Sequence, residues 1–297
     1  MSKQTNSDWV SAVILEDDDS DDEIMNSIIS KQKSDKFLES DKHLESDKSL
    51  ESDKSLESDI ETSVVKKKRI IREPLNKWFN NDTNIIEIGI DEAGRGPMFG
   101  RVYASAVVLP KDDSFQHSQM KDSKKFHSKK KIETVADYIK QHAIMWAVEY
   151  EDEQTIDEIN ILQATQSAMH KCIKSILQQL FEINIHNIHN ILLLIDGNYF
   201  KPYTIFNKTL SKMEYIRYQM IEGGDNKYTS IAAASVLAKV ERDKYIEELC
   251  IANPELIERY GIDSNKGYGS KKHMDGIRQY GITKWHRRTF GICREFC

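Results

Sequence analysis

From residue 85 onward, hydrophobic residues occur in short runs that are typical of strands and helices. The first two runs, at 85–90 and 102–109, are rich in β-branched residues and are separated by a glycine-rich turn, which indicates two successive strands. Residues 191–195 are apolar throughout, which indicates a strand buried on both faces. Further strands are expected at 144–150 and 215–221, and helices at 129–141, 156–180 and 229–249. Strands that first follow one another and then alternate with helices predict an α/β fold with a mixed sheet.

The N-terminal region is more polar and contains a short sequence repeat. The hexapeptide SDKxLE is repeated four times over residues 34–57, so its leucines are six residues apart. On a helix, a step of six residues rotates each leucine by about 240°, and the four leucines cannot form a continuous stripe. So little apolar surface cannot offset the entropy of ordering the chain. We expect residues 1–70 to be an acidic, disordered tail, and residues 80–297 to be the folded domain.

Charge is divided unevenly between these two regions. The whole chain carries −6, but residues 1–63 contain 7 basic and 18 acidic residues and therefore carry −11. The rest of the chain carries +5, and a mildly basic body suits a polyanion. In the tail, residues 13–15 (VIL) precede a run of acids and resemble a SUMO-interacting motif. The tail therefore has two interpretations, a docking segment for a protein partner or a solvated acidic appendage.

Several classes of protein are excluded by the sequence. No apolar run approaches the roughly 20 residues of a membrane span, and residues 12–15 are too short an apolar stretch for a signal peptide. The four cysteines form no CxxC pair, which argues against a zinc ribbon or a disulfide scaffold. We therefore expect a protein of a reducing compartment, cytoplasmic or nuclear, that is not secreted and contacts no membrane. We also expect it to be a monomer.

Carboxylates stand beside glycine at three places where an apolar strand ends. Asp91 and Glu92 follow the first isoleucine-rich run, Asp196 follows residues 191–195, and Asp225 follows the strand expected at 215–221. In a mixed α/β sheet, ligands collect at strand ends. Converging carboxylates repel one another and need a cation between them. Hard oxygen ligands without cysteine select Mg²⁺ or Mn²⁺ over zinc.

Each of these acids also has a simpler explanation. Asp before Gly is common in turns, and an Asp ahead of a helix is an ordinary N-cap. Either explanation would account for Asp196 alone or for Asp225 alone. The pair of Asp91 and Glu92 is harder to explain, because two adjacent acids leaving an apolar strand are electrostatically costly without a metal or a base.

The sequence DEAGRG at residues 91–96 adds glycines that let the backbone approach a ligand closely, and a guanidinium suited to phosphate. It resembles the signature of type 2 ribonuclease H, the family of bacterial ribonuclease HII and its archaeal and eukaryotic relatives. Further segments resemble that family in the same order, over about residues 84–293. They are KDSKK at 121–125, IDEINILQAT at 156–165, Asp196-Gly197, Gly224-Asp225, SIAAASVLAKV at 230–240, NKGYG at 265–269 and HRRTFG at 286–291.

The resemblance implies a fold and a set of site residues. The fold is the ribonuclease H-like fold, a five-stranded mixed sheet flanked by helices with a helical C-terminal portion. The family's four catalytic carboxylates, which hold two metal ions (Mg²⁺ or Mn²⁺), match Asp91, Glu92, Asp196 and Asp225. The implied substrate contacts are Gly94, Arg95 and Gly96 for the ribonucleotide 2′-OH, Tyr268 for the same nucleotide at its junction with DNA, and Lys124 and Lys125 for phosphates.

The implied activity is that of an endonuclease that hydrolyses the RNA strand of RNA–DNA hybrids and nicks DNA at embedded ribonucleotides. Two ions flanking the scissile phosphate would supply the nucleophile and stabilise the leaving oxygen, giving 5′-phosphate and 3′-OH ends. The expected nucleic-acid partners are therefore hybrids and ribonucleotide-containing DNA, in the setting of replication and repair.

Two alternatives remain open at the level of the sequence. The related type 3 enzymes cut hybrids but handle single ribonucleotides poorly. The AGRG after Glu92 favours type 2, and the low-complexity N-terminal region lacks the folded extra domain of type 3 enzymes. A catalytically inactive nucleic-acid-binding protein would use the same fold, although retention of all four acids argues against it. The stretch from Asp196 to Asp225 is longer than in compact bacterial members, which leaves the arrangement of residues 203–215 open.

Overall fold

The computed structural model describes residues 74–297 except positions 121–122, 124–125, 127, 186 and 208–210. The tail expected at 1–70, with its repeats and its acidic motif, lies outside the described residues. Lys124 and Lys125 lie outside them as well.

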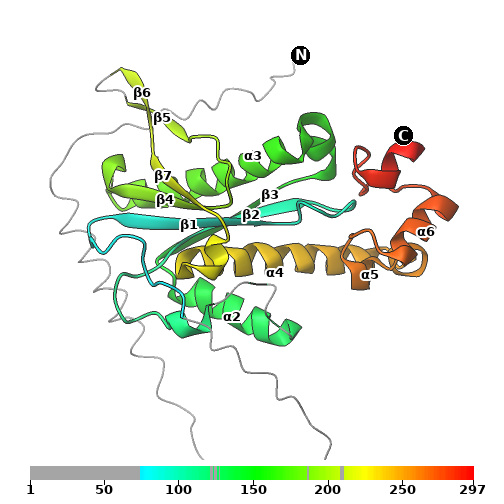
Figure 1. The fold of residues 1–297 in the computed structure, drawn as a ribbon, viewed down its shortest axis with the longest axis horizontal. Helices are drawn as coiled ribbons and strands as arrows, with labels where there is room; N and C mark the ends of the chain where they lie inside the picture. The colour runs from blue at the N-terminus through cyan, green and yellow to red at the C-terminus, as the bar shows by residue number, and fades with distance from the viewer. Residues whose placement is uncertain (1–73, 121–122, 124–125, 127, 186, 208–210) are drawn as a thin grey trace, which may run out of the picture.

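A five-stranded mixed sheet forms the centre of the protein (Figure 1). The strand order is β3-β2-β1-β4-β7. β2 pairs antiparallel with both β1 and β3, whereas β4 pairs parallel with both β1 and β7. This mixed sheet confirms the fold that the sequence predicts. The strands are β1 (Ile86–Ala93), β2 (Val102–Val108), β3 (Met145–Glu151), β4 (Ile191–Asp196) and β7 (Arg217–Ile221).

Helices cover both faces of the sheet. The long helix α3 (Glu153–Glu182) lies on one face, and α4 (Thr229–Ala252) and α2 (Lys129–His142) lie on the other (Figure 1). Successive side chains of β1 point to opposite faces of the sheet. Ile88 and Ile90 point to the face covered by α3, where they belong to the hydrophobic core. Gly89 faces α4 so closely that a Cβ there would lie 2.3 Å from the carbonyl carbon of Ser230. Glycine is therefore required for α4 to pack directly against β1.

The C-terminal part of the chain is helical and packs against the far end of α4, at the right of Figure 1. A buried cluster that includes Phe99, Ile246, Tyr260 and Ile277 joins it to the loop after β1. No helix within the described residues is long and apolar enough to cross a membrane. The C-terminal elements are the π-helical turn η5 (Leu256–Tyr260), α5 (Ile262–Asn265), α6 (Lys271–Tyr280) and the 3₁₀ turn η6 (Gly291–Phe296); shorter 3₁₀ turns are η1 (His117–Gln119), η3 (Ile188–Asn190) and η4 (Gly224–Asn226).

The element boundaries differ from the sequence prediction by up to three residues, and two of the differences have a clear structural cause. Helix α3 begins at Glu153, three residues earlier than expected, because Asp152 caps it by accepting a hydrogen bond from the Thr155 amide at 2.9 Å. The backbone of Asn160 (φ 66°) then kinks it, and the Asn160 side chain accepts from the Gln163 amide, as a second N-cap would.

The strand expected at 215–221 is divided. β5 (Thr204–Asn207) and β6 (Lys212–Tyr215) form a separate two-stranded hairpin, and β7 begins only at Arg217. Between them, the buried Ile216 donates its N–H to the carbonyl of Tyr203 at 3.1 Å. The chain therefore changes pairing partner at Ile216, and the long stretch between Asp196 and Asp225 contains the projecting hairpin of Figure 1.

Candidate active site

Asp91 and Asp196 lie at the same level on adjacent parallel strands. The ladder between β1 and β4 pairs Ile90 with Ile195, and the next residue on each strand is an acid. The alternation of side chains turns both acids to the face on which Gly89 meets α4. Two carboxylates from distant parts of the sequence are therefore neighbours beside the N-terminal half of α4.

The environment of Asp91 opposes its ionised form. Its side chain is buried, and burial raises its pKa well above the usual value, with further contributions from the charges of Glu92 and Asp196. Hydrogen bonds from the Ser235 side chain and from the Glu92 amide, at 2.7 Å for the latter, act in the opposite direction. Ser235 is supported in turn by Ser123, with 3.0 Å between the two hydroxyl oxygens. A buried acid with a raised pKa beside other carboxylates is the electrostatic signature of a site that a cation would stabilise.

Glu92 occupies a different position from Asp91. Glu92 is the next residue of β1, one position before the end of the strand, and its charge is close enough to raise the pKa of Asp91 further. Its Oε1 lies 3.3 Å from Nη1 of Arg95, whose side chain is half exposed. The loop after β1 therefore carries an accessible guanidinium next to the acids.

The fourth acid, Asp225, follows β7 in the turn η4 and is buried. One of its oxygens accepts a hydrogen bond from Nδ2 of Asn226 at 2.9 Å. The preceding Gly224 donates its N–H to Oδ1 of Asp196 at 2.6 Å, which links η4 to the end of β4. The N-cap position of α4 belongs to Tyr228, so the N-cap explanation of Asp225 does not apply.

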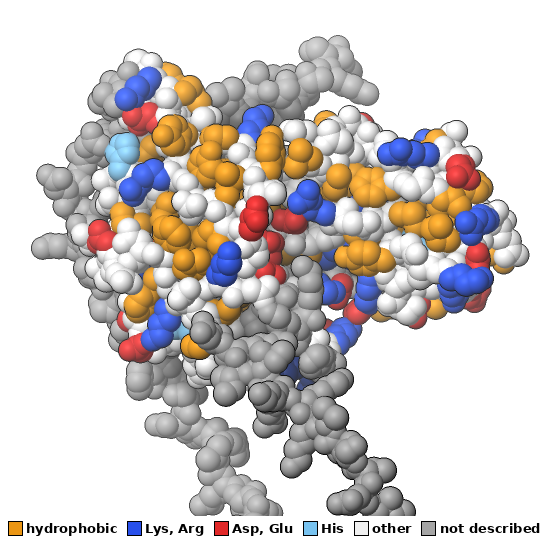
Figure 2. Space-filling view, in the orientation of Figure 1, with side chains coloured by type: hydrophobic (Ala, Val, Ile, Leu, Met, Phe, Trp, Pro, Cys, Tyr) orange, Lys and Arg blue, Asp and Glu red, His pale blue; other side chains and the backbone are white. Residues whose placement is uncertain are grey.

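The donor set of this region fits Mg²⁺ or Mn²⁺. It consists of carboxylate oxygens supplied near three strand ends, and the pKa of Asp91 is raised by burial first and then by the charges of Glu92 and Asp196. Among residues 74–297, as far as the structure describes them, no three acidic, histidine or cysteine side chains are already gathered into a metal cage. Figure 2 shows acidic side chains grouped near the centre of one face of the molecule, with basic and hydrophobic side chains around them.

A buried guanidinium holds the loop that follows β1. Arg287, which is fully buried, donates to the carbonyl groups of Gly94, Arg95, Pro97 and Gly100 at 2.6–3.0 Å. The described part of the chain contains no cis peptide bond. In a trans peptide the N–H points away from the C=O, so the amides of Arg95 and Gly96 point away from Arg287. The loop is thus held by Arg287 on one side and presents the amide N–H groups of Arg95 and Gly96 on the other.

A second buried guanidinium holds the end of the same loop and lies against its start. Arg242, on α4, donates to the carbonyls of Phe99 and Lys266 at 3.3 and 2.9 Å. Gly94 has a φ of 94°, and a Cβ there would lie 2.2 Å from Nε of Arg242. Burial and the nearby Arg242 charge lower the pKa of Arg287 to about 9. Both guanidinium groups donate hydrogen bonds to backbone carbonyls, and these bonds compensate for the cost of burying the two charges.

Tyr268 lies against this loop although it is far away in the sequence. A Cβ placed on Gly96 would be 3.5 Å from Cε1 of its ring, and 53% of the Tyr268 residue surface is exposed. The structure therefore brings together Gly94, Arg95, Gly96 and Tyr268 beside the end of β1. Sequence reasoning identified these residues but gave no role to Arg287, Arg242 or Ser235. All three lie in or next to recognised motifs, but burial of an arginine or a serine leaves no mark in the sequence.

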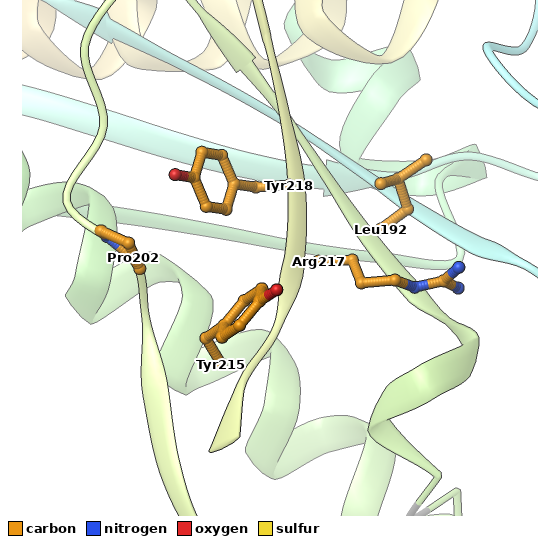
Figure 3. Close-up of a pocket in the computed structure, with 5 residues that line it drawn as sticks. All are labelled: Leu192, Pro202, Tyr215, Arg217 and Tyr218. Atoms are coloured by element: carbon orange, nitrogen blue, oxygen red, sulfur yellow. The ribbon is translucent and has the colours of Figure 1, made fainter. Parts of the chain in front are cut away.

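A pocket elsewhere on the surface is separate from this site. It is formed beside β4 and β7, has a volume of about 590 Å³ and includes Leu192 and Arg217, which pair at the start of the two strands (Figure 3). Leu192 is four residues before Asp196, or about 13 Å along the strand. The pocket is lined by Leu192, Pro202, Tyr215, Arg217 and Tyr218.

The mixed sheet, with acids at the ends of β1 and β4 and in the turn after β7, has the ribonuclease H-like fold. Solved structures share the fold. One is a ribonuclease HII from Archaeoglobus fulgidus in complex with PCNA, at 23% identity over 70% of this chain and 96% of that chain, with a TM-score of 0.51. Another is Bst-RNase HIII in complex with Mn²⁺, at 18% identity over 71% of this chain and 69% of that chain, also with a TM-score of 0.51.

Sequence comparison then specifies the family. The ribonuclease HII family model matches residues 88–293. Ribonuclease HII of Parabacteroides distasonis is 41% identical over 214 residues, which are 72% of this chain and 94% of the relative. The chain belongs to the ribonuclease HII family. It is accordingly an endoribonuclease of the ribonuclease H type, a hydrolase that acts on the RNA of RNA–DNA hybrids with divalent metal ions.

Proposed function

We propose that this enzyme also nicks duplex DNA at single embedded ribonucleotides, and that it works with two Mg²⁺ or Mn²⁺ ions held by Asp91, Glu92, Asp196 and Asp225. In such a site the ions supply a hydroxide nucleophile and stabilise the leaving 3′-oxygen, which gives 5′-phosphate and 3′-OH ends. The catalytic domain proposed for this activity spans residues 80–297. A cytoplasmic or nuclear location, a monomeric state and a protein partner for the acidic tail stay predictions from the sequence.

The observation that carries this proposal is the direction of the peptide groups in the loop after β1. Because the Gly94 and Arg95 carbonyls bond to Arg287, the amides of Arg95 and Gly96 are directed to the other side, where they are suited to a hydroxyl group. The 2′-OH distinguishes an embedded ribonucleotide from its DNA neighbours. Two backbone amides that bind one 2′-OH contact a single nucleotide, so one ribonucleotide is sufficient for recognition.

Tyr268 is proposed to sense the same nucleotide. Its half-exposed ring borders Gly96, and so the base or sugar that reaches the two amides would also meet the ring. The guanidinium of Arg95 is close to the acids and suits the adjacent phosphate. Contacts of Lys124 and Lys125 with phosphates are proposed from the family resemblance alone.

The test is a cleavage assay on duplex DNA that contains one ribonucleotide, with Mg²⁺, with Mn²⁺ and with chelator. We expect a single nick at the junction between DNA and the ribonucleotide, only when metal is present, with 5′-phosphate and 3′-OH ends. An RNA–DNA hybrid serves as the positive control for an active preparation. Cleavage of the hybrid without any nick in the duplex with one ribonucleotide would contradict the proposal.

A further inference from the structure

Two buried histidines lie in the C-terminal helical part, outside the acidic site. His273 is in the first turn of α6 and His286 is in the segment before η6, and neither has appreciable exposed surface. Their Nε2 atoms are 3.1 Å apart. The rings are enclosed by the aromatic residues Phe99 and Tyr260, whose ring centroids lie 5.0 and 5.1 Å from that of His286.

The partners at both ends of the pair fix its protons. Nδ1 of His286 lies 2.9 Å from the backbone amide of Thr283 and also 2.9 Å from the Thr283 hydroxyl oxygen. The amide can only donate, so this nitrogen accepts. Nδ1 of His273 lies 2.9 Å from the carbonyl of Tyr268, which can only accept, so this nitrogen donates. In neutral rings the remaining proton is on Nε2 of His286 and points to Nε2 of His273. The result is a chain of three hydrogen bonds that all run toward Tyr268.

An additional proton is disfavoured in this chain. A proton on Nε2 of His273 would face the one on His286. A proton on Nδ1 of His286 would face the Thr283 amide N–H, with the Thr283 hydroxyl as its one acceptor among the contacts of this nitrogen. Burial lowers the pKa of both histidines, to about 3 for His286. The pair is therefore neutral, and each ring is held in a single tautomer.

The chain also connects Tyr268 to the loop after β1. Phe99 and His286 form an isolated antiparallel bridge, in which Gly100 donates to the Trp285 carbonyl and Arg287 to the Met98 carbonyl, at 2.9 and 2.8 Å. On the other side, Met98 donates to the carbonyl of Gly267 at 2.9 Å. The segment that contains His286 is thus fixed to one end of the loop. The histidines connect that fixed position to the Tyr268 carbonyl, which also accepts from the Ser270 amide at 2.7 Å.

We infer that His286 and His273 are positioning residues for Tyr268, which they hold at the correct place over Gly96 for recognition of a single ribonucleotide. This inference rests on the proposed role of Tyr268. The Tyr268 ring is half exposed, so its placement depends on its backbone more than on packing around the ring. In a long hybrid, many consecutive contacts align the substrate, so a small displacement of Tyr268 matters less there.

The kinetic test compares kcat/KM on a duplex with one ribonucleotide and on an RNA–DNA hybrid. His273→Leu removes the bond to the Tyr268 carbonyl, whereas the Asn side chain of His273→Asn retains a donor near the position of Nδ1. We expect His273→Leu to lower the ratio of the two kcat/KM values by roughly 10-fold, the effect of one hydrogen bond, and His273→Asn to restore most of it. Combined with Tyr268→Ala, His273→Leu should have no further effect on the ratio.

A matched control is His170→Leu. His170 on α3 makes a similar bond, from Nε2 to the carbonyl of Lys201 at 2.8 Å, away from the acids, and its loss should leave the ratio unchanged. Equal losses on both substrates, or losses that add to those of Tyr268→Ala, would overturn the inference while leaving the proposed function intact. A wild-type enzyme that cuts the hybrid but does not nick the duplex would overturn both.

A measurement on the wild-type full chain is independent of whether these variants fold. Side-chain ¹⁵N NMR at pH 7 should show His286 as the neutral Nε2–H tautomer and His273 as the neutral Nδ1–H tautomer. A cationic ring, or the opposite tautomer at either position, would overturn the inference without bearing on the proposed function.

Discussion

Nη2 of Arg287 donates a hydrogen bond to the carbonyl of Gly94 at 2.6 Å, across 193 positions of sequence. The contact joins the C-terminal segment to the turn after the first strand of the sheet. Together with the bonds to Arg95, Pro97 and Gly100 it sets the direction of the peptides in that turn. In the proposed function, the direction of those peptides, more than any side chain, would make the loop suitable for binding a hydroxyl group.

Replacement of Arg287 by lysine should therefore unfold the loop and destabilise the protein. An ammonium group has three donors and no planar fork, so it cannot serve four carbonyls in fixed positions. We expect Arg287→Lys to lower the free energy of unfolding by about 2–4 kcal/mol, measured by denaturant titration. Arg288→Lys, at the exposed neighbouring position, should change it by less than about 0.5 kcal/mol. Similar values for the two variants would show that the buried fork is not required.

The two glycines of the loop should respond differently to alanine. Gly94→Ala places a methyl group 2.2 Å from the Arg242 guanidinium at a φ of 94°, so we expect a loss of about 1–3 kcal/mol in the free energy of unfolding. Gly96→Ala meets only the Tyr268 ring at an ordinary contact distance of 3.5 Å. It should fold normally and lose activity mainly on the duplex with one ribonucleotide.

Gly281→Ala gives the matched control for backbone strain, because Gly281 has a φ of 76° with open space around it. Its cost measures the conformational term alone. A Gly94→Ala variant no less stable than Gly281→Ala would argue against the close contact with Arg242.

Asp91→Asn should abolish cleavage while leaving hybrid binding largely unchanged. The substitution preserves shape but removes the charge that would hold a divalent ion, and we expect the rate to fall by at least about 100-fold. Cleavage assays and binding to a labelled hybrid measure the two effects separately. Asp137→Asn, on the exposed surface of α2, should match the wild type. Cleavage that survived Asp91→Asn would refute the assignment of the acids.

Ser235→Ala should weaken the response to metal without removing activity. Ser235 donates to Asp91 and helps to keep that carboxylate ionised and oriented. Loss of such a supporting bond typically costs 10- to 100-fold in metal affinity, so the Mg²⁺ concentration for half-maximal activity should rise by about 10-fold or more. Ser123→Ala, which acts on Asp91 only through Ser235, should give a smaller shift in the same direction. A larger shift for Ser123→Ala would contradict this order.

The raised pKa of Asp91 also predicts how stability depends on pH in the absence of metal. The folded state holds a proton on Asp91 at pH values where the unfolded chain has already released it, so stability falls as pH rises from about 4 through the folded-state pKa. The Asp91→Asn variant has no carboxyl group at this position, so its stability does not fall with rising pH for this reason. In chelator, its unfolding temperature should exceed that of the wild type at pH 8, and the difference should shrink toward pH 4. A difference that is constant over this range would contradict the prediction, and saturating Mg²⁺ should stabilise the wild type more than the variant.

The sequence alone determined the elements of the fold, because their patterns are local. Runs of β-branched residues mark β1 and β2, and unbroken apolar residues mark β4, because strand propensity and burial on both faces are properties of consecutive residues. The acids were also visible, since each follows such a run. The kink at Asn160 and the change of partner at Ile216 were not, because each depends on contacts made by a single side chain or amide.

Only the tertiary structure decided how the site is supported. Arginine in a basic segment is ordinarily a solvated surface residue, and nothing local distinguishes Arg287 from the exposed Arg288 beside it. Burial and the direction of peptide groups depend on which distant segments meet, and so does the pairing of His286 with His273. The sequence names the acids and the glycines because their chemistry is intrinsic to the residue. The buried donors that hold them in place acquire their role only through long-range contacts.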